Sequence, residues 1–356
     1  MKIFFYINTI SSGGAERVLT NLATEMSVRG HKCTIVTSFP CSWEYSYGKG
    51  VRRISLNSNK IEGYLKRNVL LTCRLRKLLV LEKPDILVSF MAEPNFRATI
   101  AKMGTGVKSI FSVRSSPHIE YRGKLAFFLA KTLFRFGNSA VFQTNDAKNW
   151  FPQAIRKKSV IIYNPIGEIF YNTRLNEVRS GIVTVGRINK LKNHKLLIEA
   201  FAKIANKIND DLTIYGSGDT ASLKIYAELL GVGQRVHFPG QISNVPFSLR
   251  NARLFVLSSG IEGMPNALME AMAIGLPCIS TDCPCGGPRM LFPKSIAAYL
   301  VPVGDSETLS ERILTVLTDR ELEIFLAQEC KKASFEFEPC RVFDRWEWLF
   351  ENVVRS

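Results

Sequence analysis

The fold is decided by the stretch LFVLSSGIEGMPNALMEAMAIGLPCISTD, residues 254–282. It begins with the continuous apolar run Leu254–Leu257, which has the length of a strand covered on both faces of a sheet. A glycine-containing loop follows, and Pro265 fits the first turn of a helix because a missing N–H costs nothing there. The helix is apolar almost throughout and ends at Gly275, after which Cys278–Ser280 predicts another strand. This strand–loop–helix–strand order predicts a parallel α/β sheet.

Two acidic residues stand out in this stretch. Glu270 lies in the apolar helix, where an ionised carboxylate is costly unless it is paired or hydrogen-bonded. Glu262 lies in the loop at the carboxyl end of the strand, where open α/β sheets bind ligands. The N–H groups of residues 263–267 point into the same space and favour phosphate. We therefore expect a ligand with sugar or ribose hydroxyls and a diphosphate; the alternative is a buried Glu270 held by a structural arginine.

The segment EGMPNALMEAMAIGLPCISTD, which begins at Glu262, resembles the signature of the family-4 retaining glycosyltransferases. These enzymes have the α/β GT-B fold, in which two Rossmann-like domains with parallel sheets face each other and a C-terminal helix crosses back to the first domain. The resemblance implies a basic, membrane-facing acceptor domain over residues 1–166, a nucleotide-sugar domain over 167–338 and a returning helix over 339–356. It implies that Glu262 holds the donor sugar and that Glu270 holds the ribose. The implied nucleotide-sugar site in this segment comprises Glu262, Gly263, Met264, Pro265, Asn266, Ala267 and Glu270.

A basic loop follows the first predicted strand of the second half, Gly181–Val185. The loop contains Arg187 and Lys192 and leads into an amphipathic helix. A guanidinium fork and a point charge beside a helix N-terminus can hold a diphosphate, although a solvated surface pair is the simpler alternative. The segment is similar to the family's GR-x4-KN element, which implies that Arg187 and Lys192 bind the phosphates of the nucleotide.

A glycine-rich turn follows the next predicted strand, Leu212–Tyr215. Its sequence GSGDTA matches the pattern of a Rossmann dinucleotide fingerprint, but no acidic residue stands about 20 residues further on to bind a ribose. In the glycosyltransferases that this chain resembles, the same loop and the V-x-F-x-G strand end line the base pocket. The resemblance therefore implies that Gly216, Phe238 and Gly240 lie there.

The first predicted strand of the chain, Lys2–Ile7, leads into the glycine pair Gly13 and Gly14 and then into an amphipathic helix that ends near Arg29. Such a turn permits the close approach of a ligand phosphate or hydroxyl, but a simple tight turn is an equal alternative. In the resembled family this loop faces the nucleotide diphosphate and the acceptor, which makes Gly14 a candidate binding residue.

Two further strands are predicted in the first half, over Ile86–Phe90 and Lys108–Val113. Asn95, Arg114 and His118 follow these strands, so we expect them at the ligand-binding edge of the sheet. Family members often place a histidine or an acidic residue near here, against the sugar. This makes His118 a candidate catalytic residue, with a surface or capping histidine as the alternative.

The net charge of +16 is unevenly distributed. Residues 1–170 contain 26 Lys and Arg against 10 Asp and Glu, whereas residues 171–356 contain 21 of each. Two stretches of the first half, Tyr64–Lys83 and Tyr121–Phe136, mix basic with apolar residues, as in helices that lie on a membrane. We expect them to dock on an anionic membrane surface, where each Lys or Arg contributes about 1 kcal/mol. Core-facing helices with a solvated basic face are the alternative.

The composition, 46% hydrophobic and 22% charged residues, is typical of a globular chain. No apolar run reaches about 18 residues and no signal-peptide pattern follows the first strand, so we expect a cytoplasmic protein on the inner face of the plasma membrane. The eight cysteines lack paired metal-binding spacing and are expected as free thiols. Glu307–Lys332 is predicted as helical, and Glu338–Val354 as a final helix. Trp346 and Trp348 fit an anchor for a helix that returns to the first domain, and a plain core role is an equal alternative.

These features predict a retaining hexosyltransferase. The expected reaction moves a hexosyl or N-acetylhexosaminyl group from a nucleotide diphosphosugar, with UDP-sugars favoured over GDP-mannose, to a lipid-linked saccharide in the assembly of lipopolysaccharide, O-antigen or capsule. The catalytic candidates are Glu262, His118, Arg187 and Lys192, and we expect no metal, no other cofactor and no nucleic-acid partner. One alternative is a GT-B nucleotide-sugar epimerase, which would convert the donor without an acceptor. The other is a basic nucleic-acid-binding protein, which the charge suggests but no recognition motif supports.

Overall fold

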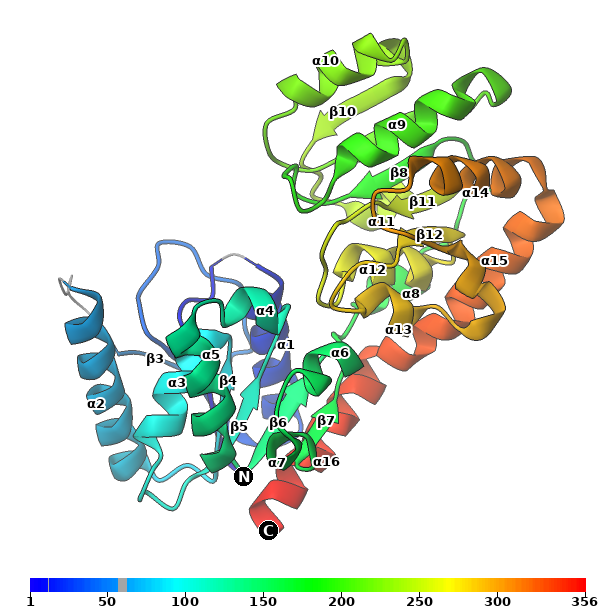
Figure 1. Ribbon diagram of the computed structural model, residues 1–356. Coiled ribbons are helices and arrows are strands. Elements are labelled where there is room, and N and C mark those ends of the chain that lie inside the picture. The colour runs from blue at the N-terminus through cyan, green and yellow to red at the C-terminus, as the bar shows by residue number, and fades with distance from the viewer. Residues whose placement is uncertain (12, 57–62) are drawn as a thin grey trace. The chain divides into compact units, whose positions relative to one another are not determined.

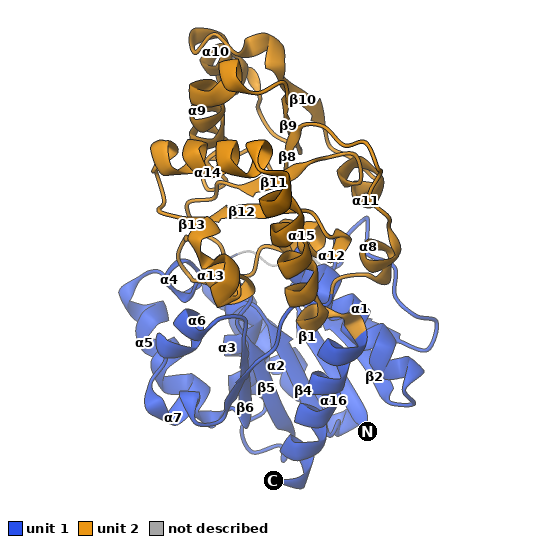
Figure 2. Cartoon of the chain, turned by 90° about the vertical axis from the view of Figure 1, so that its right-hand side faces the viewer, with its two compact units in different colours: residues 1–165, 340–356 blue, residues 166–339 orange. Residues whose placement is uncertain are grey.

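The structure, a computed structural model, describes the whole chain except residue 12 and residues 57–62. The chain forms two compact units (Figure 2): unit 1 comprises Met1–Pro165 and Cys340–Ser356, and unit 2 comprises Ile166–Pro339. Unit 1 contains 29 Lys and Arg against 12 Asp and Glu, a net charge of +17, whereas unit 2 contains 18 against 19. The basic excess of the chain therefore belongs to unit 1.

Unit 1 is built on a sheet of seven parallel strands in the order β3-β2-β1-β4-β5-β6-β7. The sequence runs outward from β1 in one direction and from β4 in the other. This is the doubly wound Rossmann arrangement, in which ligands bind beyond the carboxyl ends of the strands at the reversal of strand order, here between β1 and β4. The strands are β1 Lys2–Ile7, β2 Lys32–Thr37, β3 Arg52–Ser55, β4 Ile86–Phe90, β5 Lys108–Ser112, β6 Ser139–Phe142 and β7 Ser159–Ile161.

Helices cover both faces of this sheet (Figure 1). Neighbouring strand residues point to opposite faces, so Phe4 packs in the buried cluster with Leu71 and Leu75 of α2. Phe5 instead packs edge-on against Phe350 of α16, with 6.3 Å between ring centroids. One face thus carries α2, α3 and α5, and the other carries α1 and α16. The helices are α1 Gly14–Val28, α2 Tyr64–Glu82, α3 Ala92–Ala101, α4 Pro117–Glu120, α5 Lys124–Leu133, α6 Asn145–Asn149, α7 Gln153–Arg156 and α16 Pro339–Arg355.

The last helix, α16, packs on the sheet of unit 1 through one of its two tryptophans. Trp346 is fully buried and stacks on Phe90, with 5.9 Å between ring centroids. Arg29, at the C-terminal cap of α1, pairs with Glu347 of α16 at 2.7 Å. Trp348, by contrast, is 59% exposed, so Trp346 alone of the pair anchors the helix.

Unit 2 has the same topology with six parallel strands in the order β10-β9-β8-β11-β12-β13, so the strand order reverses between β8 and β11. Helices α9 and α14 pack together on one face, and α12 packs with α8 and α15 on the other (Figure 1). The strands are β8 Ile182–Val185, β9 Leu212–Tyr215, β10 Val236–Gly240, β11 Leu254–Leu257, β12 Cys278–Thr281 and β13 Leu300–Val301. The helices are α8 Glu168–Asn172, α9 His194–Ile204, α10 Ala221–Leu229, α11 Val245–Leu249, α12 Asn266–Ile274, α13 Gly287–Leu291, α14 Ser306–Thr318 and α15 Arg320–Ser334.

The helical prediction over Glu307–Lys332 is confirmed except at Asp319, where α14 ends and α15 begins. Asp319 has an extended backbone between α14 and α15, and its side chain accepts a hydrogen bond from the backbone N–H of Leu322 at 3.0 Å. An aspartate that caps a helix start in this way ends the preceding helix. Within the part of the chain that the structure describes, no helix combines the length and the apolar character needed to cross a membrane.

Candidate active site

Two of the predicted site residues meet at the reversal of strand order in unit 2. Lys192, on the loop after β8, places its Nζ 2.6 Å from Oε1 of Glu262, on the loop after β11. The hydroxyl of Ser259 donates a hydrogen bond to the same carboxylate oxygen at 2.7 Å. The two loops also join through their backbones, since the N–H of Gly260 donates to the carbonyl of Leu191 at 2.8 Å. The pair therefore sits where a doubly wound sheet binds its ligand.

A third loop, the one after β12, fixes the backbone of Glu262. The N–H of Glu262 donates to the carbonyl of Pro284 at 2.7 Å, and the N–H of Cys285 donates to the carbonyl of Glu262 at 2.8 Å. Gly287 shows how closely the loops approach, because a Cβ atom there would lie 1.8 Å from the carbonyl oxygen of Gly263. The acidic loop is thus held in place by its neighbours on both sides.

Helix α12 starts directly after this loop. Pro265 occupies the capping position rather than the first helical turn, which corrects the sequence-based placement by one residue. Pro265 makes no capping hydrogen bond through its side chain, and the first N–H groups of a helix have no partner within the helix itself. Glu270 is buried, with 6% of its surface exposed, as predicted. Met264, Asn266 and Ala267 line the same helix entry.

The glycine-rich loop after β9 supports the basic loop by backbone contact. Gly216 has φ +151°, and a Cβ atom there would lie 1.8 Å from the carbonyl oxygen of Gly186. The N–H of Gly216 also donates to the carbonyl of Gly240 at 2.9 Å. Arg187, next to Gly186, is exposed. The G-x-G pattern is therefore explained by close approach of two loops, without a dinucleotide.

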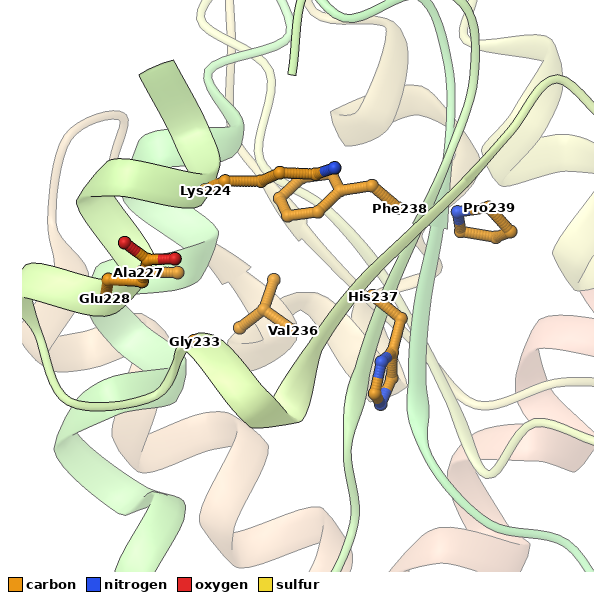
Figure 3. A pocket seen from close by; sticks show the side chains of 8 residues that line it. All are labelled: Lys224, Ala227, Glu228, Gly233, Val236, His237, Phe238 and Pro239. Carbon is orange, nitrogen blue, oxygen red and sulfur yellow. The ribbon is translucent and has the colours of Figure 1, made fainter. Parts of the chain in front are cut away.

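Phe238 stands two residues before Gly240 on β10. It lines a hollow of about 390 Å³ between α10 and the edge strand β10, where Figure 3 shows its ring alongside the Lys224 side chain. The structure therefore brings Gly216 and Gly240 together through their backbones but turns the Phe238 ring toward α10.

His194, the first residue of α9, is a site feature that the sequence analysis missed. It is 3% exposed and borders a hollow of about 510 Å³ between the starts of α9 and α10. Burial, together with the charge of Lys192, lowers the pKa of His194 to about 4. The imidazole is therefore neutral at physiological pH.

Unit 1 carries a polar cluster at its own reversal of strand order, which the sequence analysis also missed. Arg97 of α3 is 3% exposed, and its Nε donates to the hydroxyl of Tyr6 at 2.9 Å. Its guanidinium also donates to Asn8, which follows β1, and to Asn68 of α2. The amide of Asn8 in turn donates to Glu93 at 3.3 Å. A buried arginine with several partners fixes its neighbours, so Asn8 and Glu93 are presented at the edge where ligands bind.

The candidates Gly14 and His118 belong to unit 1. Gly14 is the exposed first residue of α1, whereas its neighbour Gly13 adopts φ +128°, a conformation that favours glycine. His118 is exposed on α4 and lies edge-on to the indole of Trp150, with 6.0 Å between ring centroids.

Two other expected cleft residues are buried instead. Asn95 is fully buried inside α3, accepts a hydrogen bond from Ser89 at 2.8 Å and donates to the carbonyl of Ser112 at 3.0 Å, so it joins β4, α3 and β5. Arg114 is 8% exposed and donates to Asn164, and burial lowers its pKa to about 9. Asn95 follows the end of β4 as expected, and its side chain satisfies backbone and side-chain groups between elements.

The fold and the site define a class of protein. Two doubly wound units, the second with a lysine–carboxylate pair and an uncapped helix start at its ligand-binding edge, are the architecture of GT-B glycosyltransferases. The chain belongs to the family-4 glycosyltransferases: residues 166–334 match the family described as "Glycosyl transferases group 1", and residues 12–167 match "Glycosyltransferase Family 4". In the described residues, no three His, Cys, Asp or Glu side chains are grouped so that they could hold a metal ion.

Similar proteins span the whole chain. One is the GalNAc-alpha-(1->4)-GalNAc-alpha-(1->3)-diNAcBac-PP-undecaprenol alpha-1,4-N-acetyl-D-galactosaminyltransferase of Campylobacter jejuni, 24% identical over 367 residues that cover 100% of both chains. Another is the N-acetyl-alpha-D-glucosaminyl L-malate synthase of Bacillus anthracis, 24% identical over 97% of this chain and 96% of that one. Among solved structures, Anabaena HepE in complex with UDP has a TM-score of 0.83 at 18% identity and covers 99% of this chain and 100% of its own. The similarity to HepE shows that the two chains share a fold.

Proposed function

We propose that this glycosyltransferase moves a hexosyl or N-acetylhexosaminyl group from a UDP-sugar to a lipid-linked saccharide, with retention at the anomeric carbon. The observation that carries the proposal is the pair of Lys192 and Glu262 at the reversal of strand order in unit 2, beside the start of α12. The Campylobacter relative, by its name, acts on an undecaprenol-linked saccharide, and HepE was solved with UDP. Both support the proposed substrate classes.

The charges of unit 2 support a diphosphate in the donor. Lys192 and Arg187 lie on one loop, and the first turn of α12 has amides without a side-chain cap. Cations and helix amides of this kind stabilise the negative charge that develops on a leaving diphosphate. We therefore propose that transfer proceeds without a metal ion.

We infer that donor binding exchanges the partners of Glu262. In the structure its carboxylate accepts hydrogen bonds from Lys192 and Ser259. A diphosphate competes for the Lys192 ammonium, and hydroxyls of the donor sugar can donate to the released carboxylate oxygen. Glu270, one turn into α12 and buried, is proposed to hold the ribose hydroxyls. Lys192 then stabilises the negative charge of the leaving diphosphate, while Glu262 orients the donor sugar.

The proposed chemistry needs no nucleophile from the protein. The acceptor hydroxyl attacks the anomeric carbon on the face from which the nucleoside diphosphate leaves. The bond from this carbon to the diphosphate oxygen breaks, the new glycosidic bond forms, and the hydroxyl proton passes to the departing phosphate. Retention follows because attack and departure share one face.

A lipid-linked acceptor implies work at a membrane surface. Unit 1 carries a net charge of +17, which favours adsorption to an anionic leaflet. We propose that unit 1 binds the acceptor and that the protein associates peripherally with the cytoplasmic face of the membrane, in the assembly of a cell-surface polysaccharide.

The first experiment measures binding of UDP, GDP and ADP sugars by the shift in thermal unfolding. A ligand present at about 100 times its Kd adds about 2.7 kcal/mol of stability, so the preferred nucleotide should stand out. We expect UDP-sugars to bind to the wild type and Glu270→Ala to bind them at least about tenfold more weakly. Equal shifts with all three nucleotides, or none, would argue against the donor assignment.

The second experiment supplies the preferred donor with and without an undecaprenyl-diphosphate-linked saccharide, in the presence and absence of EDTA. We expect glycosylated lipid only when the acceptor is present. Its new linkage should have the α configuration when the donor sugar is α-linked, and EDTA should not lower the yield of product. Conversion of the donor alone would identify an epimerase instead.

A further inference from the structure

We propose that one defined surface of unit 1 inserts into the interface of an anionic phospholipid bilayer. The inference rests on the proposed function, because a lipid-linked acceptor places the reaction at a membrane. It goes further by assigning the contact to the outer side of α4, α5 and the 3-10 helix Phe134–Phe136 that follows α5. We call this surface the α5 face, and its apolar members are Ile119, Leu125, Phe127, Phe128 and Phe136.

The apolar side chains of the α5 face are unusually exposed. Leu125 is 70% exposed, Phe128 63% and Phe136 58%. The structure describes every residue of α5, and among them Ala130 alone is buried. Single exposed apolar residues are normal on a soluble protein, but several large ones on one short helix and its flanks mark a contact surface.

Aromatic rings line a hollow beside this helix. The hollow has a volume of about 650 Å³ and lies between the α4–α5 turn and Trp150. The Trp150 indole packs edge-on to Phe127 at 5.2 Å and stacks on Tyr121 at 5.7 Å, both measured between ring centroids. Tyr121 is buried, whereas Trp150 is partly exposed, and tryptophan concentrates where a membrane meets water because one part of its ring system is apolar and the other is polar.

Cations surround the apolar residues. The ammonium of Lys131 lies 4.1 Å from the ring centroid of Phe127, and Arg122, Lys124 and Arg135 are exposed at the ends of the helix. The single acidic residue of the segment 117–136 is Glu120, whose Oε2 is buried. The α5 face therefore combines apolar side chains with an excess of basic over acidic residues in segment 117–136, which matches an anionic leaflet. Each cation near such a leaflet strengthens adsorption about fivefold.

The α2 helix is the natural comparison, because it is also basic. Its exposed Leu65 and Val69 are 78% and 63% exposed, close to the values on α5. However, α2 exposes one aromatic ring, that of Tyr64, against three on the α5 face, and its C-terminal end carries Glu82, paired with Lys2 at 2.6 Å and Arg52 at 2.9 Å. We expect α2 to contribute charge and the α5 face to contribute insertion.

The test is co-sedimentation of the full-length protein with vesicles that contain no polyprenyl lipid. One set is phosphatidylcholine with about 30% phosphatidylglycerol, and the other is phosphatidylcholine alone. We expect at least about tenfold stronger partitioning to the anionic set. The partition coefficient of the double variant Leu125→Ser/Phe128→Ser for anionic vesicles should be at least about tenfold below that of the wild type. The coefficient of the matched Leu65→Ser/Val69→Ser variant should stay within about threefold of the wild-type value.

A second measurement does not depend on loss of function. Phe128→Trp keeps an apolar ring, and its fluorescence should shift to shorter wavelength when anionic vesicles are added. Unfolding temperature and UDP-sugar binding are measured on every variant, so a misfolded protein or a failed donor assignment is recognised separately from failed docking.

Three results would overturn the proposal. The first is that Leu125→Ser/Phe128→Ser partitions to anionic vesicles as strongly as the wild type, or that the Phe128→Trp fluorescence does not shift when vesicles are added. The second is equal binding of the wild type to neutral vesicles, which would remove the role of charge. The third is binding only after polyprenyl diphosphate is added, which would make the lipid of the acceptor the occupant of this surface.

Discussion

Glu323 accepts a hydrogen bond from Arg253 at 2.8 Å although the side chain of the glutamate is fully buried. Arg179 and Arg320 donate to the other carboxylate oxygen, at 3.0 and 2.6 Å. Glu323 lies in α15, whereas Arg253 precedes β11 and Arg179 precedes β8. This carboxylate therefore ties α15 to the two central strands that lead into the candidate active site.

Removing this carboxylate should unfold unit 2 more easily. Because Glu323→Ala removes the fully buried carboxylate and leaves the Arg179 side chain, which is 10% exposed, without that partner, we expect the free energy of unfolding to fall by about 3–5 kcal/mol. Glu321→Ala is the matched control, since Glu321 is exposed in the same helical turn and its loss should cost less than about 1 kcal/mol. Denaturant unfolding measures both; similar values would show that the arginines find other partners.

The two tryptophans of α16 should behave oppositely. Trp346→Ala leaves a cavity against Phe90 and should cost about 3–5 kcal/mol of unfolding free energy. Trp348→Ala changes an exposed side chain and should stay within about 0.5 kcal/mol. A large loss for Trp348→Ala would mean that its exposed ring has a partner in solution.

Gly216 should not tolerate a side chain. A Cβ atom there meets the carbonyl of Gly186 at 1.8 Å, so Gly216→Ala must displace the loop that carries Arg187, at a cost of order 1–3 kcal/mol. The matched change is Gly260→Ala, where the added atom would find ordinary contact at 3.7 Å from the carbonyl of Leu191. We expect Gly216→Ala to bind UDP more weakly and to unfold at a lower temperature. Gly260→Ala should keep the unfolding temperature of the wild type. Unchanged values for Gly216→Ala would contradict the close approach of the two loops.

Glu120 should make unit 1 sensitive to pH. Burial raises its pKa from 4.5 to about 7, so between these values the folded chain holds a proton that the unfolded chain has lost. Protonation therefore favours folding at low pH, and the free energy of unfolding should fall as the pH rises from about 4.5 to about 7. Glu120→Gln removes this slope and should be the more stable protein above pH 7, by up to about 3 kcal/mol. Parallel pH profiles for the two proteins would contradict the raised pKa.

The regular segments could be predicted from the sequence because their signals are local. The apolar run Leu254–Leu257 is β11, and the glycine after the apolar helix ends α12 with φ +97° at Gly275. Both Rossmann-like topologies follow from alternating strands and helices of this kind. The burial of Glu270 followed from the apolar residues on every side of it.

What the sequence could not supply is which side chains meet across loops. Lys192 and Glu262 were both candidates, but their 2.6 Å pairing depends on how the loops after β8 and β11 settle. The cluster around Arg97 joins residues from β1, α2 and α3, and no local sequence pattern predicts that they meet. The assignments of Gly14 and His118 to substrate contacts stay predictions.

The most direct test of the central claim is the turnover number for transfer from the preferred UDP-sugar by Lys192→Ala, compared with Lys190→Ala. Lys190 is an exposed cation on the same loop, so its variant removes the same charge at a matched position. If Lys192 stabilises the leaving diphosphate, its loss should reduce kcat by about 100-fold to 1,000-fold, with a smaller change in donor binding, while Lys190→Ala stays within about threefold of wild type. Equal rates in the two variants would contradict the assignment of the donor site to the Lys192–Glu262 pair.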